Sequence, residues 1–366
     1  KTLELNNKVK KIIQEKNKAV QEQDFEEASR LKDEQYKLEN ELSNMIVKKS
    51  VKKPLPVITK KQVAKIIELK TKIPIYEVNN DTKALLKKLN KNLKEKILGQ
   101  DEIINSICAY TRKIYFGFKK DKPYSFLFVG PTGVGKTLFV KEYATSLYGS
   151  DNFIRIDMSE YKEEYSISKL LGSAPGYVGY REDNTVMEKI RNHPNCVILL
   201  DEIEKASPAV IKVFLQALDE GVVHDAVGRS ISFKNAIIFM TSNLGCNNLS
   251  IGFVDDNSLN QSLKDFLSVE FLNRIDKVFT FKKLDEVVVK KIINKKLNML
   301  KKQYYDKDIN VAFSKKIVDN ILAKSNYLEY GARKIDKIIE EEVENYIMEE
   351  IICGNSSISV REFSGE

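Results

Sequence analysis

Apolar residues recur every three or four positions through residues 1–50, a segment that is otherwise charged and contains neither proline nor glycine. This spacing predicts two helices, with Asp24 and Glu27 forming a capping-box start signal for the second. We therefore expect an antiparallel helical hairpin. Such a hairpin buries little apolar area alone, so it either packs on another part of the protein or offers a docking surface to a partner. The apolar stripes are Val9, Ile12, Ile13, Ala19 and Val20 in the first helix, and Phe25, Ala28, Leu31, Leu38, Leu42 and Met45 in the second.

Helical periodicity stops at residues 48–56, where two prolines lie among lysines. Prolines interrupt helices and charged residues keep a segment solvated, so this stretch predicts a linker. We assign residues 51–92 to the linker and to short helices near 60–70 and 81–94. A further helix is expected through Ile103, Ile104 and Ile107.

From residue 93 onwards, short apolar runs alternate with helical segments. This alternation predicts an α/β domain over residues 93–283, with a parallel sheet covered by helices on both faces. The strand-like runs are 126–129, 153–156, 196–200 and 236–241. From about residue 285 the pattern becomes helical up to a possible strand at 358–360, which predicts a small, mostly helical domain over residues 284–366.

The charge balance of 60 Lys and Arg against 52 Asp and Glu gives a formal net charge of +8. The lysines are scattered among acidic residues in the predicted helices, as on a solvated surface, so we expect no nucleic-acid partner. The longest apolar runs are far shorter than the roughly 20 residues of a membrane span, so we expect no membrane contact. Lysine greatly outnumbers arginine, and the arginines that remain are candidates for chemistry that needs a planar cation.

The four cysteines lie far apart, form no C-x-x-C pair and are accompanied by only 2 histidines. This spacing argues against a zinc site. Cys196 opens a strand-like run and Cys108 lies in a helical pattern. We interpret the cysteines as small buried apolar residues in a reducing compartment.

The strongest chemical signal is the sequence Gly-Pro-Thr-Gly-Val-Gly-Lys-Thr at residues 130–137, directly after the run 126–129 and before a helical segment. It fits the phosphate-binding loop G-x-x-x-x-G-K-[ST] in the expected context. The glycines let backbone N–H groups face the phosphates of ATP, Lys136 reaches the β and γ oxygens, and Thr137 ligates Mg²⁺. The loop residues are Gly130, Pro131, Thr132, Gly133, Val134, Gly135, Lys136 and Thr137.

Asp201 and Glu202 lie at the end of the strand-like run 196–200. Side chains alternate across a strand, so the two carboxylates point in different directions. Asp201 can hold the metal ion and its water shell, while Glu202 faces the attacking water as the general base. Together with the phosphate-binding loop, this pair predicts that the chain hydrolyses ATP.

Two further polar residues fit the same pocket. Asn243 follows the run 236–241, and Arg274 lies in a Phe-Leu-Asn-Arg-Ile-Asp segment. Each has a structural alternative, because Asn243 could turn the chain after a strand and Arg274 could form a surface ion pair.

Together these motifs resemble the second AAA+ module of the Clp-family unfoldases, most closely ClpC, preceded by the UVR-like hairpin of that family. The resemblance covers nearly the whole chain, and the motifs follow the family's order. They are the hairpin motif at 24–33, Ile73 with Pro74, residues 98–100, the loop at 130–137, and Asp201 with Glu202.

The resemblance implies roles that the local sequence leaves open. It implies that Asn243 is the sensor that orients the hydrolytic water and that Arg333 is the second sensor. It also implies that Arg274 is the finger presented to the γ-phosphate of a neighbouring subunit, and it adds Leu98 and Leu138 to the ATP-binding residues. An arginine supplied in trans implies a closed ring, and the family ring is a homohexamer.

Two loops complete the resemblance. Tyr177 and Val178 resemble the pore loop that grips an unfolded polypeptide, and the alternative is a surface turn that carries a tyrosine. Ile251, Gly252 and Phe253 lie among polar residues and resemble the tripeptide that docks ClpP; the alternative is a loop that folds its own Ile and Phe against the body. Residues 70–74 and 181–184 depart from the family pattern, so we expect packing at the module's entrance and the grip of the pore loop to differ from those of the family.

The resemblance implies an ATP-driven protein unfoldase and translocase that feeds a ClpP-type protease, with a possible adaptor on the hairpin. The main alternative is a protease-independent disaggregase of the same fold. An inert scaffold and a nucleic-acid motor are further alternatives, opposed by intact Lys136, Glu202 and Arg274 and by Tyr177, respectively. The lysine- and asparagine-rich sequence suggests a plastid stroma, such as that of an apicoplast, or the cytoplasm of an AT-rich bacterium.

Overall fold

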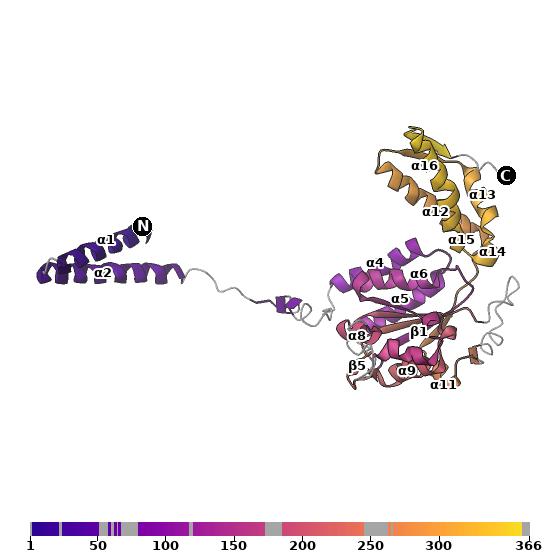
Figure 1. Cartoon of the computed structure of the whole chain (residues 1–366), viewed down its shortest axis with the longest axis horizontal. Coiled ribbons are helices and arrows are strands. Elements are labelled where there is room, and N and C mark those ends of the chain that lie inside the picture. The colour runs from indigo at the N-terminus through magenta and orange to yellow at the C-terminus, as the bar shows by residue number, and fades with distance from the viewer. Residues whose placement is uncertain are drawn as a thin grey trace. The chain divides into compact units, whose positions relative to one another are not determined.

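The chain divides into two compact units, Lys1–Ile66 and Ile67–Glu366 (Figure 1). Among the described helices, none combines the length and the apolar character that a membrane crossing requires. The computed structural model describes residues 2–21, 24–50, 58–59, 62–63, 65–66, 80–116, 120–172, 185–244, 263–264 and 266–360.

The first unit contains the predicted helical hairpin, formed by α1 (Thr2–Gln21) and α2 (Phe25–Ser50). Ala19, Ala28 and Leu31 are buried between the two helices. The Asp24 carboxylate accepts the N–H of Glu27 at 3.1 Å, which is one half of the predicted capping box. The other half is absent, because the N–H of Asp24 donates to the carbonyl of Ala19 and the Glu27 side chain pairs with Arg30. Among the described side chains, the apolar core between α1 and α2 is small, as the sequence predicts.

The second unit is built on a five-stranded parallel sheet in the order β2-β3-β6-β1-β7. Its strands are β1 (Tyr124–Val129), β2 (Phe153–Asp157), β3 (Val197–Asp201), β6 (Ile237–Ser242) and β7 (Lys277–Thr280). The four predicted runs are confirmed as strands. β7 is an additional strand that the pattern does not predict, because only its phenylalanine is buried. All carboxyl ends meet at one edge, where parallel sheets place their ligand sites.

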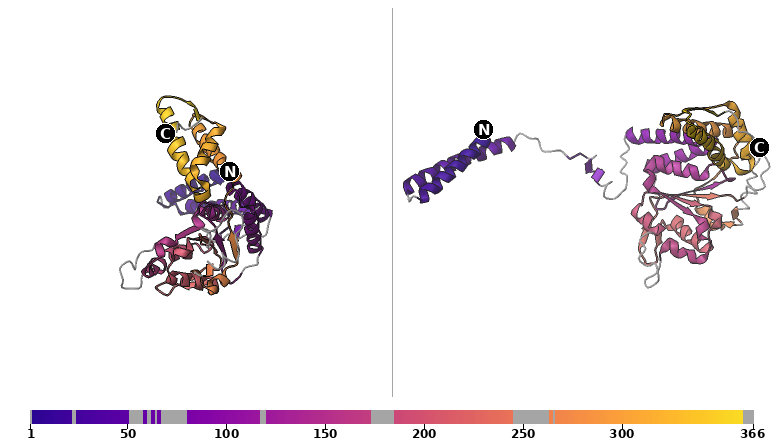
Figure 2. Two further views of the ribbon diagram at one scale, coloured as in Figure 1. Left: turned by 90° about the vertical axis from the view of Figure 1, so that its right-hand side faces the viewer. Right: turned by 45° about the horizontal axis from the view of Figure 1, so that its top comes forward.

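Helices cover both faces of this sheet (Figure 1, Figure 2). One layer contains α4 (Asn80–Lys96), α5 (Asp101–Tyr115) and α6 (Lys136–Tyr148), and the other contains α7 (Ile167–Leu171), α8 (Val186–Asn192), α9 (Pro208–Glu220) and α11 (Val269–Arg274). Along β1, Phe126 and Phe128 pack in the first layer while Leu127 and Val129 pack in the second. This alternation is the two-residue period of a strand, and it confirms the predicted α/β fold.

Shorter elements lie between these strands and helices along the chain. They are the antiparallel pair β4 (Val222–His224) and β5 (Ser230–Ser232), and the 3-10 helices η1 (Ser150–Asn152), η2 (Met158–Tyr161), η3 (Glu164–Ser166) and η4 (Ile203–Lys205).

The C-terminal part, called the lid below, is mostly helical, as predicted. It contains α12 (Glu286–Tyr305), β8 (Asn310–Phe313), α13 (Lys315–Ser325), α14 (Tyr327–Tyr330), α15 (Arg333–Ile338), the π-helical η5 (Ile339–Glu344), α16 (Asn345–Ile352) and β9 (Ser357–Val360). β9 confirms the predicted terminal strand, and it pairs in parallel with β8, which the pattern does not predict. Val289 and Ile293 on α12 share one apolar cluster with Leu89 and Leu93 on α4, so the lid packs on the sheet-containing part.

The three described cysteines have two kinds of environment, and Cys246 lies outside the described residues. Cys108 and Cys196 are buried, which confirms their interpretation as core residues, whereas Cys353 is exposed and that interpretation is wrong for it. Cys353 directly follows the last residue of α16, where the chain turns away from the helix. Burial raises the pKa of the Cys196 thiol to about 12 and also raises the pKa of Cys108, so both stay protonated.

Candidate functional site

The predicted phosphate-binding loop connects β1 to α6. Gly133 and Gly135 adopt φ values of 74° and 98°, which residues with a side chain rarely adopt. Because α6 begins at Lys136, the N–H groups of its first turn lie at the loop. The loop and the helix N-terminus therefore provide a site that favours an anion.

The Lys136 side chain is nearly buried, with 8% of its surface exposed. Its ammonium group donates hydrogen bonds to the carbonyl oxygens of Gly130 at 2.6 Å and Pro131 at 2.8 Å. It also donates to Oδ1 of Asn243 at 2.8 Å. The structure thus brings together two residues that lie 107 positions apart in the sequence, as the prediction of a shared pocket requires.

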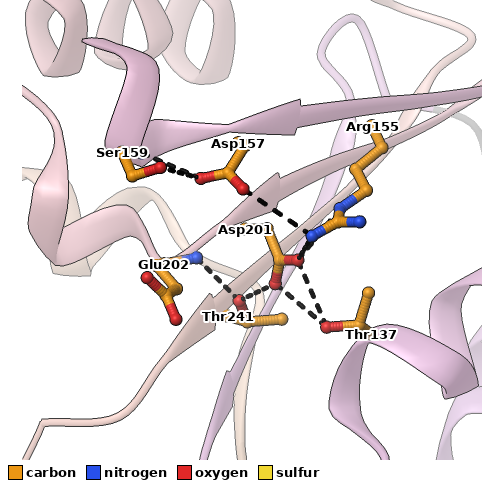
Figure 3. A network of polar contacts seen from close by, with 7 residues as sticks. All are labelled: Thr137, Arg155, Asp157, Ser159, Asp201, Glu202 and Thr241. Atoms are coloured by element: carbon orange, nitrogen blue, oxygen red, sulfur yellow. Dashed lines mark hydrogen bonds and ion pairs between the residues drawn. The ribbon is translucent and has the colours of Figure 1, made fainter.

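Asp201 lies at the centre of a network of polar contacts (Figure 3). Its Oδ1 accepts hydrogen bonds from the hydroxyl groups of Thr137 at 3.1 Å and Thr241 at 2.6 Å. Its Oδ2 accepts the Nε–H of Arg155 at 3.1 Å, and a terminal guanidinium nitrogen lies 2.8 Å away. Thr137 and Asp201 therefore present adjacent oxygen atoms, the donor type that Mg²⁺ prefers.

Glu202 has a left-handed backbone conformation, with φ 56° and ψ 58°. Its N–H donates to the hydroxyl oxygen of Thr241 at 2.9 Å, which fixes this turn to β6. Figure 3 shows the Glu202 carboxylate pointing away from that of Asp201, in agreement with the predicted divergence of the pair. Backbone strain of this kind occurs at functional sites where the surroundings impose it.

Two further carboxylates support the site. Asp157, at the end of β2, accepts the N–H of Ser159 at 3.0 Å and its hydroxyl at 2.6 Å. The hydroxyl bond is the main cause that lowers the pKa of Asp157, so this carboxylate stays ionised. Glu204 accepts the backbone N–H of Asn243 at 3.1 Å and so positions the residue whose side chain contacts Lys136.

A cavity of about 910 Å³ extends from the phosphate-binding loop to the lid. Leu98 and Leu138 line it together with Arg333 of the lid, as the resemblance implies for nucleotide-binding residues. Gln100 holds the segment near Leu98 in place, because its side chain donates to the carbonyl of Lys282 at 2.9 Å. The cavity is also lined by residues of the phosphate-binding loop and of the polar network, namely Gly133, Lys136, Thr137, Arg155, Asp157, Asp201, Glu202 and Asn243.

The lid touches the phosphate-binding loop through backbone atoms. The N–H of Ala332 donates to the carbonyl oxygen of Gly133 at 3.0 Å. Gly331 has φ 59° and ψ −141°, and a Cβ added there would lie 2.7 Å from the carbonyl carbon of Gly133. Only glycine permits this approach, so the position of Arg333 at the start of α15 depends on it.

Arg274 does not line the cavity of its own chain. It lies in the last turn of α11 and forms an ion pair with Asp219 of α9, with Nε 2.8 Å from Oδ1. A terminal guanidinium nitrogen donates to Oδ2 at 3.2 Å. Within one chain Arg274 therefore makes the ion pair that the sequence offers as its structural alternative.

The remaining predicted residues, Tyr177, Val178, Ile251, Gly252 and Phe253, lie outside the described part of the chain, as do Ile73 and Pro74. The structure also adds residues that the motifs do not predict, namely Arg155, Asp157, Thr241 and Glu204. The sequence offered one indication for Arg155, because arginine is scarce in this sequence and each arginine is a candidate for a functional cation. For Thr241 the signal was its place at the end of a buried strand.

Three family profiles match the chain. An AAA domain profile (Cdc48 subfamily) matches residues 121–278, the C-terminal D2-small domain of ClpB protein matches 284–361, and the UvrB/uvrC motif matches 6–41. The matches cover the sheet-containing part, the lid and the hairpin, respectively.

Curated relatives are similar over most of this chain. The ATP-dependent Clp protease ATP-binding subunit ClpE of Lactococcus lactis is 39% identical over 94% of this chain and 47% of the relative. ClpC of Staphylococcus aureus is 36% identical over 96% of this chain and 45% of the relative. This chain thus spans about half the length of these relatives.

A solved structure of Hsp104 with ATPγS and FITC casein shares the fold. Its TM-score is 0.74 at 29% identity, over 83% of this chain and 55% of that chain.

Proposed function

The chain belongs to the Clp family of AAA+ ATPases, and from this premise we propose that the protein hydrolyses ATP in order to unfold and translocate other polypeptides. The observation that carries the proposal is the convergence of Lys136, Asn243 and the Thr137–Asp201 pair on one cavity. At about 910 Å³, this cavity lies within the size range of cofactor sites, roughly 300 to 1,000 Å³.

Thr137 and Asp201 would hold Mg²⁺, which neutralises charge on the phosphates when bound. Lys136 binds the β and γ oxygens, and Asn243 keeps the ammonium group directed through their 2.8 Å contact. Glu202 accepts a proton from the attacking water while the oxygen of that water forms a bond to the γ-phosphorus. The bond from that phosphorus to the bridging oxygen breaks, and ADP and phosphate leave.

Two arginines would complete the site. Arg333 would contact the γ-phosphate and so couple the bound nucleotide to the position of the lid. It is the first residue of α15, directly after the contact between Ala332 and Gly133. Arg274 would act on the nucleotide of a neighbouring subunit in a hexameric ring of identical chains. In this assignment the Arg274–Asp219 ion pair presents the guanidinium from α11 at the surface rather than toward its own cavity.

We assign the substrate and protease contacts to loops outside the described residues. Tyr177 and Val178 would contact the unfolded polypeptide in the ring pore, and Ile251, Gly252 and Phe253 would dock a ClpP-type protease. The names of the ClpE and ClpC relatives, which describe ATP-binding subunits of a Clp protease, support this pairing. The hairpin, with its small core, would offer a surface to an adaptor.

A protease-independent disaggregase of the same fold is the second candidate, and the fold is shared with Hsp104 solved with ATPγS and FITC casein. We also propose the domain division 1–50, 51–92, 93–283 and 284–366. The D2-small profile begins at residue 284, in support of the last boundary, and the UvrB/uvrC motif at 6–41 lies within the first division. The relatives named above are bacterial and give no support to a plastid location.

The decisive experiment adds ATP, a folded substrate and a ClpP-type protease to the full-length protein and follows unfolding and degradation. Burying Ile251 and Phe253 would contribute about 1.5 to 3 kcal/mol each, multiplied by several copies in a ring. The double variant Ile251→Ala/Phe253→Ala should therefore lose degradation but keep ATP hydrolysis. Undiminished degradation would refute the docking role and favour the disaggregase. Loss of ATPase activity would show that the two residues belong to the core.

A further inference from the structure

The Asp201 carboxylate, a proposed Mg²⁺ ligand, forms an ion pair with the side chain of Arg155. Arg155 reaches its Oδ2 from the neighbouring strand β2, through Nε at 3.1 Å and a terminal nitrogen at 2.8 Å. The Asp201 side chain is 9% exposed, whereas that of Arg155 is 51% exposed. A buried carboxylate is thus neutralised by a guanidinium group that retains access to solvent.

A second carboxylate lies within reach of the same guanidinium group. Oδ2 of Asp157 lies 3.7 Å from a terminal nitrogen of Arg155. Asp157 and Asp201 are paired residues at the ends of β2 and β3, so the register of the sheet places them side by side. Ser159 holds the Asp157 carboxylate in place with two hydrogen bonds through Oδ1, which leaves Oδ2 directed toward Arg155 (Figure 3).

We propose that Arg155 is a positioning residue that competes with Mg²⁺ for Asp201 and transfers to Asp157 when the metal ion binds. The inference rests on the proposed function, because it assumes that Thr137 and Asp201 hold the metal ion. A guanidinium group and a divalent cation on one carboxylate repel each other, so a metal ion held by Thr137 and Asp201 weakens the contact between Arg155 and Oδ2. Asp157 provides the departing guanidinium group with a fixed, ionised partner, whose Oδ2 already lies 3.7 Å from its terminal nitrogen.

This exchange sets how much Mg²⁺ the site requires. When the metal ion is scarce, Arg155 forms the ion pair with the Asp201 carboxylate. Mg²⁺ binding must break this ion pair, so its energy weakens the affinity of the site for Mg²⁺. Asp157 reduces the free-energy cost of breaking the ion pair, because it stabilises the displaced guanidinium group. Replacing Arg155 and replacing Asp157 should therefore shift the Mg²⁺ requirement in opposite directions, which a purely structural role for the two residues would not do.

The test titrates Mg²⁺ into the full-length protein with fluorescently labelled ADP and records the Mg²⁺ concentration at half-maximal change in binding. Arg155→Gln should lower this concentration about fivefold to tenfold, since the pair lies between an exposed ion pair and a buried charge-assisted hydrogen bond. Asp157→Asn keeps an oxygen for Ser159 and should raise it. The Arg155→Gln/Asp157→Asn double variant should match Arg155→Gln, because Asp157 acts through Arg155.

Arg191→Gln is the matched control, because Arg191 pairs with Glu188 on its own helix and should leave the Mg²⁺ requirement unchanged. A double variant that retains the full effect of Asp157→Asn would overturn the inference. A rise in the half-maximal Mg²⁺ concentration with Arg155→Gln would also overturn it. Nucleotide binding that does not respond to Mg²⁺ in the wild type would overturn it as well. Failure of the wild type to bind labelled ADP at all would instead refute the proposed function.

Discussion

Gly331 provides a sharp test of the contact between the lid and the phosphate-binding loop. A Cβ at this position would lie 2.7 Å from the carbonyl carbon of Gly133 and 2.8 Å from the carbonyl oxygen of Thr132. These are backbone atoms of a loop fixed between β1 and α6, so they cannot move aside as a flexible side chain would. Gly331→Ala should therefore separate the lid from the loop.

The expected magnitude follows from two costs. A non-glycine residue in this backbone region costs about 1 to 3 kcal/mol, and loss of the bond from Ala332 to Gly133 costs about 0.5 to 1.5 kcal/mol. Their sum, about 1.5 to 4.5 kcal/mol, corresponds to roughly 10- to 2,000-fold in the equilibrium constant for docking of the lid. Because Arg333 begins the next helix, ATP affinity should fall with it.

Binding of a labelled ATP analogue to the full chain measures this effect, with thermal unfolding as a check on the fold. Gly354→Ala is the matched control, since Gly354 also has a positive φ, 87°, but a Cβ there meets nothing within 4 Å. The control should lose some stability and retain its ATP affinity. Equal affinities for the two variants would refute the reasoning.

Two other predictions concern assembly and thiol reactivity. Subunits with Arg274→Ala, mixed with subunits with Glu202→Gln, should regain some ATP hydrolysis at interfaces that pair an intact base with an intact finger; mixed rings without activity would exclude the role in trans. In the native chain, a thiol reagent should modify Cys353 and spare Cys108 and Cys196, whose pKa values burial raises, as mass spectrometry would show. Modification of Cys196 before unfolding would contradict its placement in the core.

The sequence predicts those parts of the fold that depend on local pattern. The apolar runs of β1, β2, β3 and β6 and the glycine spacing of the phosphate-binding loop are visible within a few residues. Asp201 and Glu202 could be assigned because they follow such a run directly. β7 escaped prediction because only one of its residues is buried.

Other parts of the site depend on which strands are neighbours. Arg155 and Thr241 contact Asp201 only because β2 and β6 flank β3 in the sheet, an order that no local pattern specifies. Gly331 illustrates the same point, since its constraint arises from a loop about 200 residues earlier in the chain. Arg274 is visible in the sequence as a candidate, but its proposed target belongs to another subunit.

The central claim is that Lys136 and Glu202 belong to one site that binds and hydrolyses ATP. Its most direct test measures ATP binding and phosphate release on the same preparation of Glu202→Gln, with Lys136→Ala as the companion variant. Glu202→Gln should bind ATP like the wild type but release phosphate about 10² to 10⁴ times more slowly, the usual contribution of a general base. Lys136→Ala should lose binding itself. Normal phosphate release by Glu202→Gln would contradict the account.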